Sequence, residues 1–146
     1  MDQALAKLNR LFKKQNEIYR ECAKNAGITE SKFWLLYALC ASNDSKSESE
    51  FTQYNFCEDW CFSKQTINTA VSDLEKEGLI KLEFTPGSRK HKSIKLTASG
   101  EEFCQAKIRS VLRAEKKSLM KLGSEERAEF LDLLERLLLC LESELL

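Results

Sequence analysis

Hydrophobic residues recur at the spacing of an α-helix through the first part of this 146-residue chain. They predict an opening helix that ends near Gly27 and a second helix that Thr29 can cap and that continues through Cys40. Residues 42–50 form a low-complexity polar stretch, which predicts a mobile loop between two helices. The apolar face of the opening helix comprises Leu5, Leu8, Leu11, Phe12, Tyr19 and Cys22.

The last part of the chain is also helical in pattern. Thr97 can cap a long helix that stops at Gly123, and Ser124 can cap a final helix. Apolar residues occupy several faces of that final helix, more than one small domain can cover, so we expect burial against a second copy. The alternative is a monomeric bundle with an unusually apolar end. The residues predicted for dimerisation are Leu5, Leu8, Phe12, Leu134, Leu137, Leu138, Leu141 and Leu145.

The middle of the chain contains a helix with two distinct faces. Ser63 can cap its first turn and Gly78 can end it. One face is an apolar stripe, and the opposite face is short, polar and nearly uncharged. Amide side chains on such a face can pair with the N6/N7 edge of adenine, although an ordinary solvated face has the same composition. The apolar stripe is Ile67, Ala70, Val71 and Leu74, and the polar face is Gln65, Thr66, Asn68, Thr69 and Ser72.

A basic hairpin is predicted directly after this helix. Apolar residues alternate on both sides of a turn signal at residues 85–87. Between Pro86 and Leu96 the charged side chains are all cations: Arg89, Lys90, Lys92 and Lys95. Cations on a projecting loop suit contact with phosphates or with a narrow minor groove.

A shorter helix precedes the polar one. Thr52 can cap it, and Phe56 and Trp60 fall four residues apart on one face. Residues 61–63 then form the turn of a helix-turn-helix. Together with the hairpin, this order predicts a mainly α winged helix-turn-helix fold with about six helices, a small β-hairpin wing and a helical dimerisation region from both termini.

Four short motifs lie in this part of the chain: TQ at Thr52-Gln53, SKQT from Ser63 to Thr66, LEKEGLI from Leu74 to Ile80, and LTASG from Leu96 to Gly100. In these motifs the chain resembles the multiple antibiotic resistance regulator (MarR) family. Two positions depart from the family pattern: Cys61 replaces the glycine of the helix-helix turn, and Ser88 precedes Arg89 where the family has an aspartate. The long helices before and after the helix-turn-helix and its hairpin also follow the family, so the resemblance covers the whole chain.

The resemblance implies a division into a dimerisation helix at residues 1–28, a DNA-binding region at 29–97 and dimerisation helices at 98–146, within one compact domain. It also implies that an effector binds between the dimerisation helices and the DNA-binding region. Candidates to line that pocket are Tyr19, Phe33, Trp34, Tyr37 and Phe103. Expected DNA contacts come from Ser63, Lys64, Gln65, Thr66, Asn68, Thr69, Ser72, Arg89, Lys90 and Lys92.

The formal net charge is zero, but the charges are segregated along the chain. Residues 63–97 carry seven bases and four acids, whereas residues 124–146 carry two bases and seven acids. A neutral total is therefore compatible with a local basic surface. The sequence shows no signal peptide and no apolar run of membrane length, so we expect a cytoplasmic protein with no membrane association.

The six cysteines should be reduced thiols in that compartment. They include no C-x-x-C pair, and His91 is the single histidine, so we expect no zinc site and no cofactor. Most of the thiols fall on apolar faces and suit core packing, and Cys22 is the candidate for redox sensing. The motifs of catalytic and phosphate-binding loops are absent, which argues against an enzyme.

These observations favour a dimeric regulator of transcription that binds double-stranded, pseudo-palindromic operator DNA. By resemblance it is a repressor that a small-molecule or redox signal releases. The alternative is a winged-helix module that binds another protein and not DNA. The basic hairpin and the polar helix face favour DNA, because a protein-binding module would be expected to present an acidic wing or a bulky apolar face.

Overall fold

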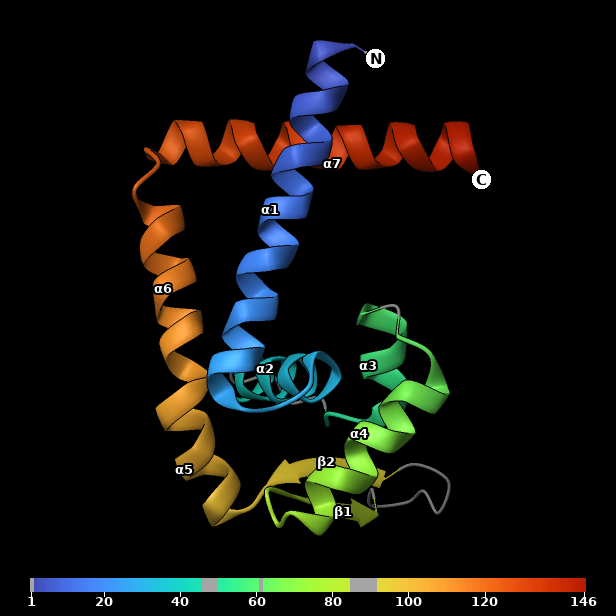
Figure 1. Ribbon diagram of the computed structural model, residues 1–146, viewed down its shortest axis with the longest axis vertical. Coiled ribbons are helices and arrows are strands. Elements are labelled where there is room, and N and C mark those ends of the chain that lie inside the picture. The colour runs from blue at the N-terminus through green and yellow to red at the C-terminus, as the bar shows by residue number, and fades with distance from the viewer. Residues whose placement is uncertain (1, 46–49, 61, 85–91) are drawn as a thin grey trace. The chain divides into compact units, whose positions relative to one another are not determined.

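The computed structural model describes residues 2–45, 50–60, 62–84 and 92–146, shown as a ribbon in Figure 1. It is mainly helical with one two-stranded antiparallel hairpin, as predicted. Contacts divide the chain into two compact units, Met1–Val111 and Leu112–Leu146. The elements in the described residues are α1 (Gln3–Ala26), α2 (Glu30–Asp44), α3 (Gln53–Trp60), α4 (Lys64–Lys76), β1 (Ile80–Phe84), β2 (Lys92–Leu96), α5 (Ala98–Lys107), α6 (Arg109–Met120) and α7 (Ser124–Leu145).

Four of the predicted helix starts are confirmed by side-chain caps. The hydroxyl of Thr29 accepts from the backbone N–H three residues ahead at 3.4 Å, and Thr52 and Ser63 do the same at 3.1 and 3.2 Å. Thr97 accepts from the N–H of Gly100 at 3.0 Å. Each cap satisfies a donor that the first helical turn leaves without a partner, which is why these helices begin where the sequence places a hydroxyl.

The predicted stop at Gly78 is also confirmed. Its φ is 76°, a left-handed conformation that a side chain disfavours. Its N–H donates to the carbonyl of Glu75 and the N–H of Leu79 donates to that of Leu74, both at 3.0 Å. This pair of bonds closes α4 and turns the chain directly into β1.

Three expectations about helix boundaries are wrong. α2 continues to Asp44, so the first three residues of the polar stretch 42–50 are helical, while the expected mobility of residues 46–49 lies outside the described residues. The helix expected from Thr97 to Gly123 is divided at Ile108 into α5 and α6. The side chain of Ile108 is completely buried at this break. The final helix is capped by Gly123 and not Ser124, because the Glu126 carboxylate accepts from the Gly123 N–H at 2.9 Å.

The core of the first unit forms where α2, α4 and the hairpin meet. The predicted apolar stripe of α4 is buried there, with Ile67 and Leu74 fully inaccessible. α2 contributes Phe33, Leu36 and Leu39 to the same core, and α2 contacts α1, α4, α5 and β2. Burial of these side chains leaves the polar face of α4 as its exposed side, which positions that face on the surface.

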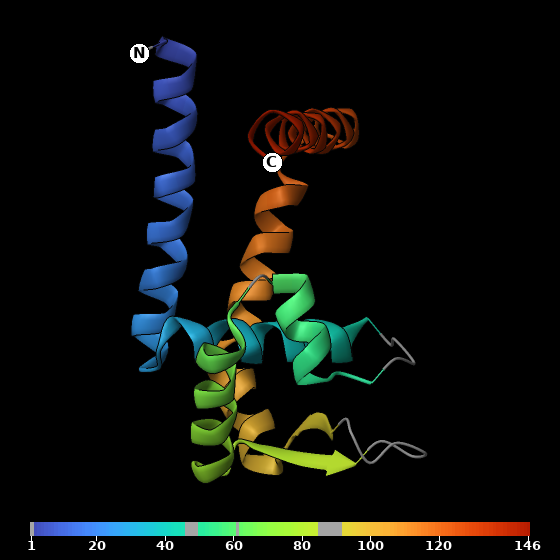
Figure 2. The same ribbon diagram turned by 90° about the vertical axis from the view of Figure 1, so that its right-hand side faces the viewer.

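The hairpin is joined to the helix-turn-helix by a third extended segment. β1 and β2 pair in register from Ile80 opposite Leu96 to Phe84 opposite Lys92. On the other side of β2, Thr52 pairs with Ser93, and the N–H of Ile94 donates to the carbonyl of Phe51 at 2.7 Å. Figure 2 shows α3 and α4 in green, with the hairpin strands below α3 and beside the lower part of α4. The base of the hairpin is therefore hydrogen-bonded to the backbone segment that leads into α3.

The second unit comprises most of α6, the connection that follows it and α7. The guanidinium of Arg127 donates to the carbonyl of Leu122 at 3.0 Å, which fixes the connection against the start of α7. α7 buries none of its residues, and most of its large apolar side chains are exposed. Within the described part of the chain, none of the helices combines the length and apolar character needed to cross a membrane.

Candidate nucleic-acid interface

The polar face of α4 is the first component of the candidate site. All seven residues that the sequence predicted for DNA contact on this helix are exposed, including the cap. They project from the first three turns, on the side opposite the buried stripe. The set is Ser63, Lys64, Gln65, Thr66, Asn68, Thr69 and Ser72.

Hydrogen bonds orient several of these side chains. The Ser63 hydroxyl donates to that of Thr66 at 2.8 Å, and the Thr69 hydroxyl donates to the backbone carbonyl of Gln65 at 3.1 Å. The amide of Gln53, on α3, donates to the amide oxygen of Asn68. This bond uses the amide oxygen of Asn68, whose N–H₂ group supplies two further donors. Sequence reasoning identified Asn68 but missed Gln53, because this pair spans two helices.

The hairpin is the second component, and its charges are partly compensated. The Glu83 carboxylate bonds Lys81 at 3.0 Å and Lys95 at 2.9 Å. The hydrogen bond from Lys95, then that from Lys81, lowers the pKa of Glu83, and the same partner raises the pKa of Lys95. Lys92 instead lies 5.1 Å above the ring of exposed Phe84, an attraction between a cation and an aromatic face.

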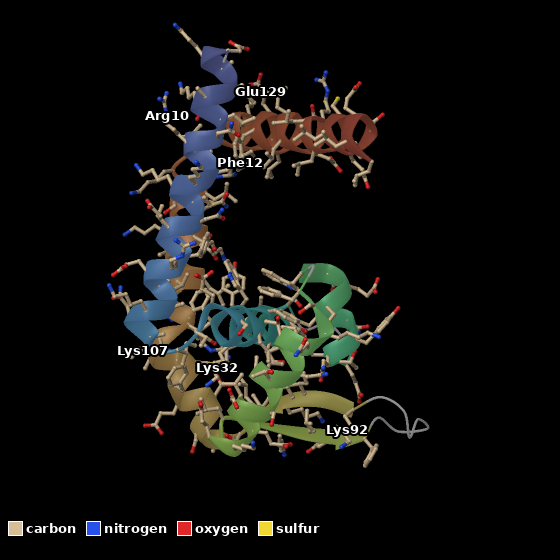
Figure 3. All side chains as sticks on the ribbon, turned by 45° about the vertical axis from the view of Figure 1, so that its right-hand side comes forward. Arg10, Phe12, Lys32, Lys92, Lys107 and Glu129 are labelled. Carbon is tan, nitrogen blue, oxygen red and sulfur yellow. The ribbon has the colours of Figure 1, made fainter. Side chains whose placement is uncertain are left out.

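The tip of the hairpin lies outside the described residues. This includes the predicted contacts Arg89 and Lys90, the turn at residues 85–87 and His91. Lys92, labelled in Figure 3, is the predicted wing contact that the structure does place, at the start of β2. Its ammonium group carries no carboxylate partner among the described ion pairs, so it is available to an external anion.

A shallow pocket of about 360 Å³ separates the start of α2 from α4. Lys32 lines it and is labelled in Figure 3. Its ammonium lies 2.6 Å from Glu77 and 3.8 Å from Asp73, and its side chain is 14% exposed. These pairs join α2 to the C-terminal end of α4 and place opposite charges beside Lys32. The remaining lining residues are Thr29, Ser31, Gln65, Thr66, Thr69 and Ala70.

Most of the residues predicted to line an effector pocket are brought together in an aromatic cluster. Trp34 lies at its centre, with ring centroids 4.8 Å from Tyr19 and 5.2 Å from Tyr37. Trp60, which sequence reasoning did not include, lies 5.3 Å from Trp34. Phe33 also contacts Trp34, but it is fully buried. Phe103 is half-buried on α5 and takes no part in the ring contacts of the described residues.

The predicted dimerisation residues lie on both units. On α1, Leu5 is 49% exposed, while Leu8 and Phe12 are half-buried. On α7, Leu138, Leu141 and Leu145 are exposed, and Leu134 and Leu137 are half-buried. Cys22, the predicted redox candidate, is half-buried on α1.

Gly100 supports the base of the hairpin, a role that sequence reasoning missed although it quoted the LTASG motif. A Cβ atom at this position would lie 1.8 Å from the carbonyl oxygen of Leu79. The N–H of Thr97 donates to that same carbonyl at 3.1 Å, and the Thr97 hydroxyl donates to the carbonyl of Gly78 at 2.5 Å. The absence of a side chain therefore lets α5 approach the segment between α4 and β1.

Comparison with solved structures shows the fold of MarR family transcriptional regulators over nearly the whole chain. NMB1585, a MarR family regulator from Neisseria meningitidis, is 21% identical with a TM-score of 0.77, covering 99% of this chain and 96% of that one. A protein described as a MarR family transcriptional regulator from Listeria monocytogenes, complexed with 26mer DNA, is 18% identical with a TM-score of 0.71, covering 99% and 92%. The S. aureus MepR–DNA complex gives 19% identity and a TM-score of 0.69, covering 97% and 98%.

No protein-family model and no curated protein matches the sequence. The structural likeness therefore defines the class of fold, a MarR-like winged helix-turn-helix, at sequence identities near one in five. Two of the three similar structures contain DNA.

Proposed function

We propose that this chain is a sequence-specific regulator of transcription that binds double-stranded DNA. The observation that carries the proposal is the exposed polar face of α4, which lies beside a hairpin that presents Lys92. An α-helix fits the major groove of B-DNA, where hydroxyl and amide groups can distinguish base edges. The DNA complexes among proteins of the same fold support this assignment.

The two components of the surface are proposed to divide the work. Gln65, Thr66, Asn68 and Thr69 supply contacts to base edges, because they lie within the first two turns of α4. Arg89, Lys90 and Lys92 supply contacts to phosphates or to the minor groove. The N–H₂ of exposed Asn68 suits an acceptor such as N7 of a purine, since Gln53 occupies its oxygen.

We propose that the regulator acts as a homodimer through its terminal helices. The exposed apolar side chains of α7 include Phe130, Leu131 and Leu139 besides the residues predicted for dimerisation, more than a solvated helix presents. A two-fold dimer matches a pseudo-palindromic operator whose half-sites lie about one helical turn apart, roughly 34–36 Å.

Release by a small molecule is proposed to involve the aromatic cluster. Tyr19, Trp34, Tyr37 and Trp60 are half-buried, so a planar ligand can contact their rings after a small side-chain movement. The cluster joins α1, α2 and α3, the last of which holds Asn68 through Gln53. A ligand that displaces Trp60 would therefore affect the polar face of α4 through α3 and Gln53. The proposed action is repression relieved by this signal.

The test is to select binding sites from random-sequence DNA duplexes and then measure affinities by fluorescence anisotropy at several salt concentrations. Asn68→Ala should weaken binding to the selected site by about 1–3 kcal/mol and change binding to random DNA little. Lys92→Ala should weaken both and reduce the salt slope by about one. Lys107→Ala removes an exposed lysine at the end of α5 and serves as the matched control.

If no sequence is enriched and the variants bind DNA with the same affinity as the wild type, the protein-binding alternative is favoured. That alternative shares the fold but places no requirement on Asn68 or Lys92. Thermal-shift screening with phenolic and lipophilic anions then tests the effector site, with Trp60→Phe as a variant that preserves an aromatic ring.

A further inference from the structure

Two buried cysteines face each other between α2 and α5. Cys40 and Cys104 are both 0% exposed, and both are free thiols. The two helices that carry them are in contact. Neither thiol belongs to the candidate nucleic-acid interface or to the aromatic cluster.

Arg109 shows how these helix faces are aligned. Its guanidinium bonds Asp44 on α2 and, at 2.7 Å, Glu101 on α5. Asp44 is four residues after Cys40 and Glu101 is three residues before Cys104, so each acid shares a helix face with one of the thiols. Because one side chain bridges both acids, the two faces oppose each other, and the thiols meet one turn away from the bridge.

The environment differentiates the two sulfur atoms. The side-chain hydrogen bond between them lowers the pKa of Cys104, while burial acts in the opposite direction. The same hydrogen bond, with burial, raises the pKa of Cys40. The nearby Arg109 cation favours the thiolate at both positions, and Glu101 opposes it. Within the pair, Cys40 therefore donates the hydrogen bond and the Cys104 sulfur accepts it, which makes Cys104 the sulfur that more readily takes the thiolate form.

We infer that Cys40 and Cys104 form a modification site at which a small hydroperoxide produces a reversible disulfide within one chain. The Cys104 sulfur attacks the peroxide, the O–O bond breaks, and the products are a sulfenic acid and an alcohol, or water when the oxidant is hydrogen peroxide. The Cys40 sulfur then attacks the Cys104 sulfur, and the S–O bond breaks. Hydroxide leaves and takes the Cys40 proton as water, so two electrons pass from the thiols to the peroxide.

The position of the pair gives the disulfide a defined effect. The loop that it closes runs from residue 40 to residue 104 and contains α3, α4 and both strands. A cross-link between the ends of a loop this long restricts the unfolded chain and should stabilise the whole enclosed region. Since neither thiol is exposed, oxidation requires local opening and should be slower than that of exposed Cys140.

Peptide mapping tests the inference on the wild-type chain. After treatment with hydrogen peroxide, free thiols are blocked with N-ethylmaleimide and the protein is digested with trypsin without reduction. Cleavage after lysine releases residues 33–46 and 96–107, each of which contains one cysteine. The expected product is these two peptides linked and separated again by dithiothreitol. The oxidised protein should also unfold at a temperature higher by on the order of 10 °C.

Cys40→Ala and Cys104→Ala should each abolish the linked peptide and the thermal shift, whereas Cys140→Ala should retain both. Circular dichroism establishes whether each variant is folded, and if a core variant is not, the wild-type map decides alone. The inference is overturned if peroxide that fully modifies Cys140 leaves peptides 33–46 and 96–107 separate, whether as maleimide adducts or as sulfinic acids. It is also overturned if Cys40 forms its disulfide with a different cysteine. Neither outcome bears on DNA binding.

Discussion

Gly100→Ala is a sharp test of how the hairpin is held against α5. The new Cβ would lie 1.8 Å from the carbonyl oxygen of Leu79 and 2.8 Å from its carbonyl carbon. Both neighbours are backbone atoms, so the collision cannot be relieved by rotating a side chain. The same carbonyl accepts from the N–H of Thr97, and relief of the collision would stretch that 3.1 Å bond.

The magnitude follows from two opposing effects. Forcing extra volume into a packed contact costs about 1–3 kcal/mol, and loss of the Thr97 hydrogen bond adds about 1 kcal/mol. Alanine in place of glycine in a helix returns about 1 kcal/mol. We therefore expect Gly100→Ala to lower the free energy of unfolding by about 1–3 kcal/mol. Ser99→Ala, on the exposed side of the same helical turn, should change it by less than about 0.5 kcal/mol.

Urea unfolding monitored by tryptophan fluorescence is a suitable assay, because both tryptophans lie in the first unit and contact each other. The two variants must be compared at one protein concentration, since association would otherwise change the apparent stability. A Gly100→Ala protein as stable as the wild type would refute the close approach of α5 to the Leu79 carbonyl.

Three further perturbations test the surfaces. The first changes three α7 leucines together to glutamate, at Leu134, Leu138 and Leu141, and should produce monomer or aggregate. An unchanged sedimentation coefficient in a soluble triple variant would place the interface elsewhere. Glu83→Gln frees Lys81 and Lys95 from their shared partner, so anisotropy should show stronger binding to random DNA and a steeper salt slope; equal slopes would mean that these lysines lie away from the phosphates. Arg89→Ala should weaken binding to the selected site, and affinities equal to wild type at every salt concentration would show that the wing does not touch DNA.

Features that depend on neighbours in the sequence could be predicted. The caps at Thr29, Thr52, Ser63 and Thr97 each need one hydroxyl and an N–H three residues ahead, so the sequence contains the whole interaction. The buried stripe of α4 follows from helical spacing in the same way. The structure bears out these predictions and the hairpin.

Features that depend on distant residues could not be predicted. The break at Ile108 involves no proline or glycine, and the next residue, Arg109, bonds Asp44, which is 65 residues away. The cap at Gly123 depends on the Glu126 side chain, which competes with the local hydroxyl signal at Ser124. The orientation of Asn68 depends on Gln53, fifteen residues earlier on another helix. In each case tertiary contacts select one of several local possibilities.

The pairing of β2 with residues 51–52 also affects how the protein avoids aggregation. A free hairpin has two open edges, and each can add a strand from another molecule. Here the outer edge of β2 is occupied by the hydrogen bond between Ile94 and Phe51 and by the bridge at Thr52. β1 carries the charged Lys81 and Glu83, which oppose the approach of a further strand. Because strand addition is disfavoured at both edges, self-association should proceed through the exposed apolar faces of helices and not through the hairpin.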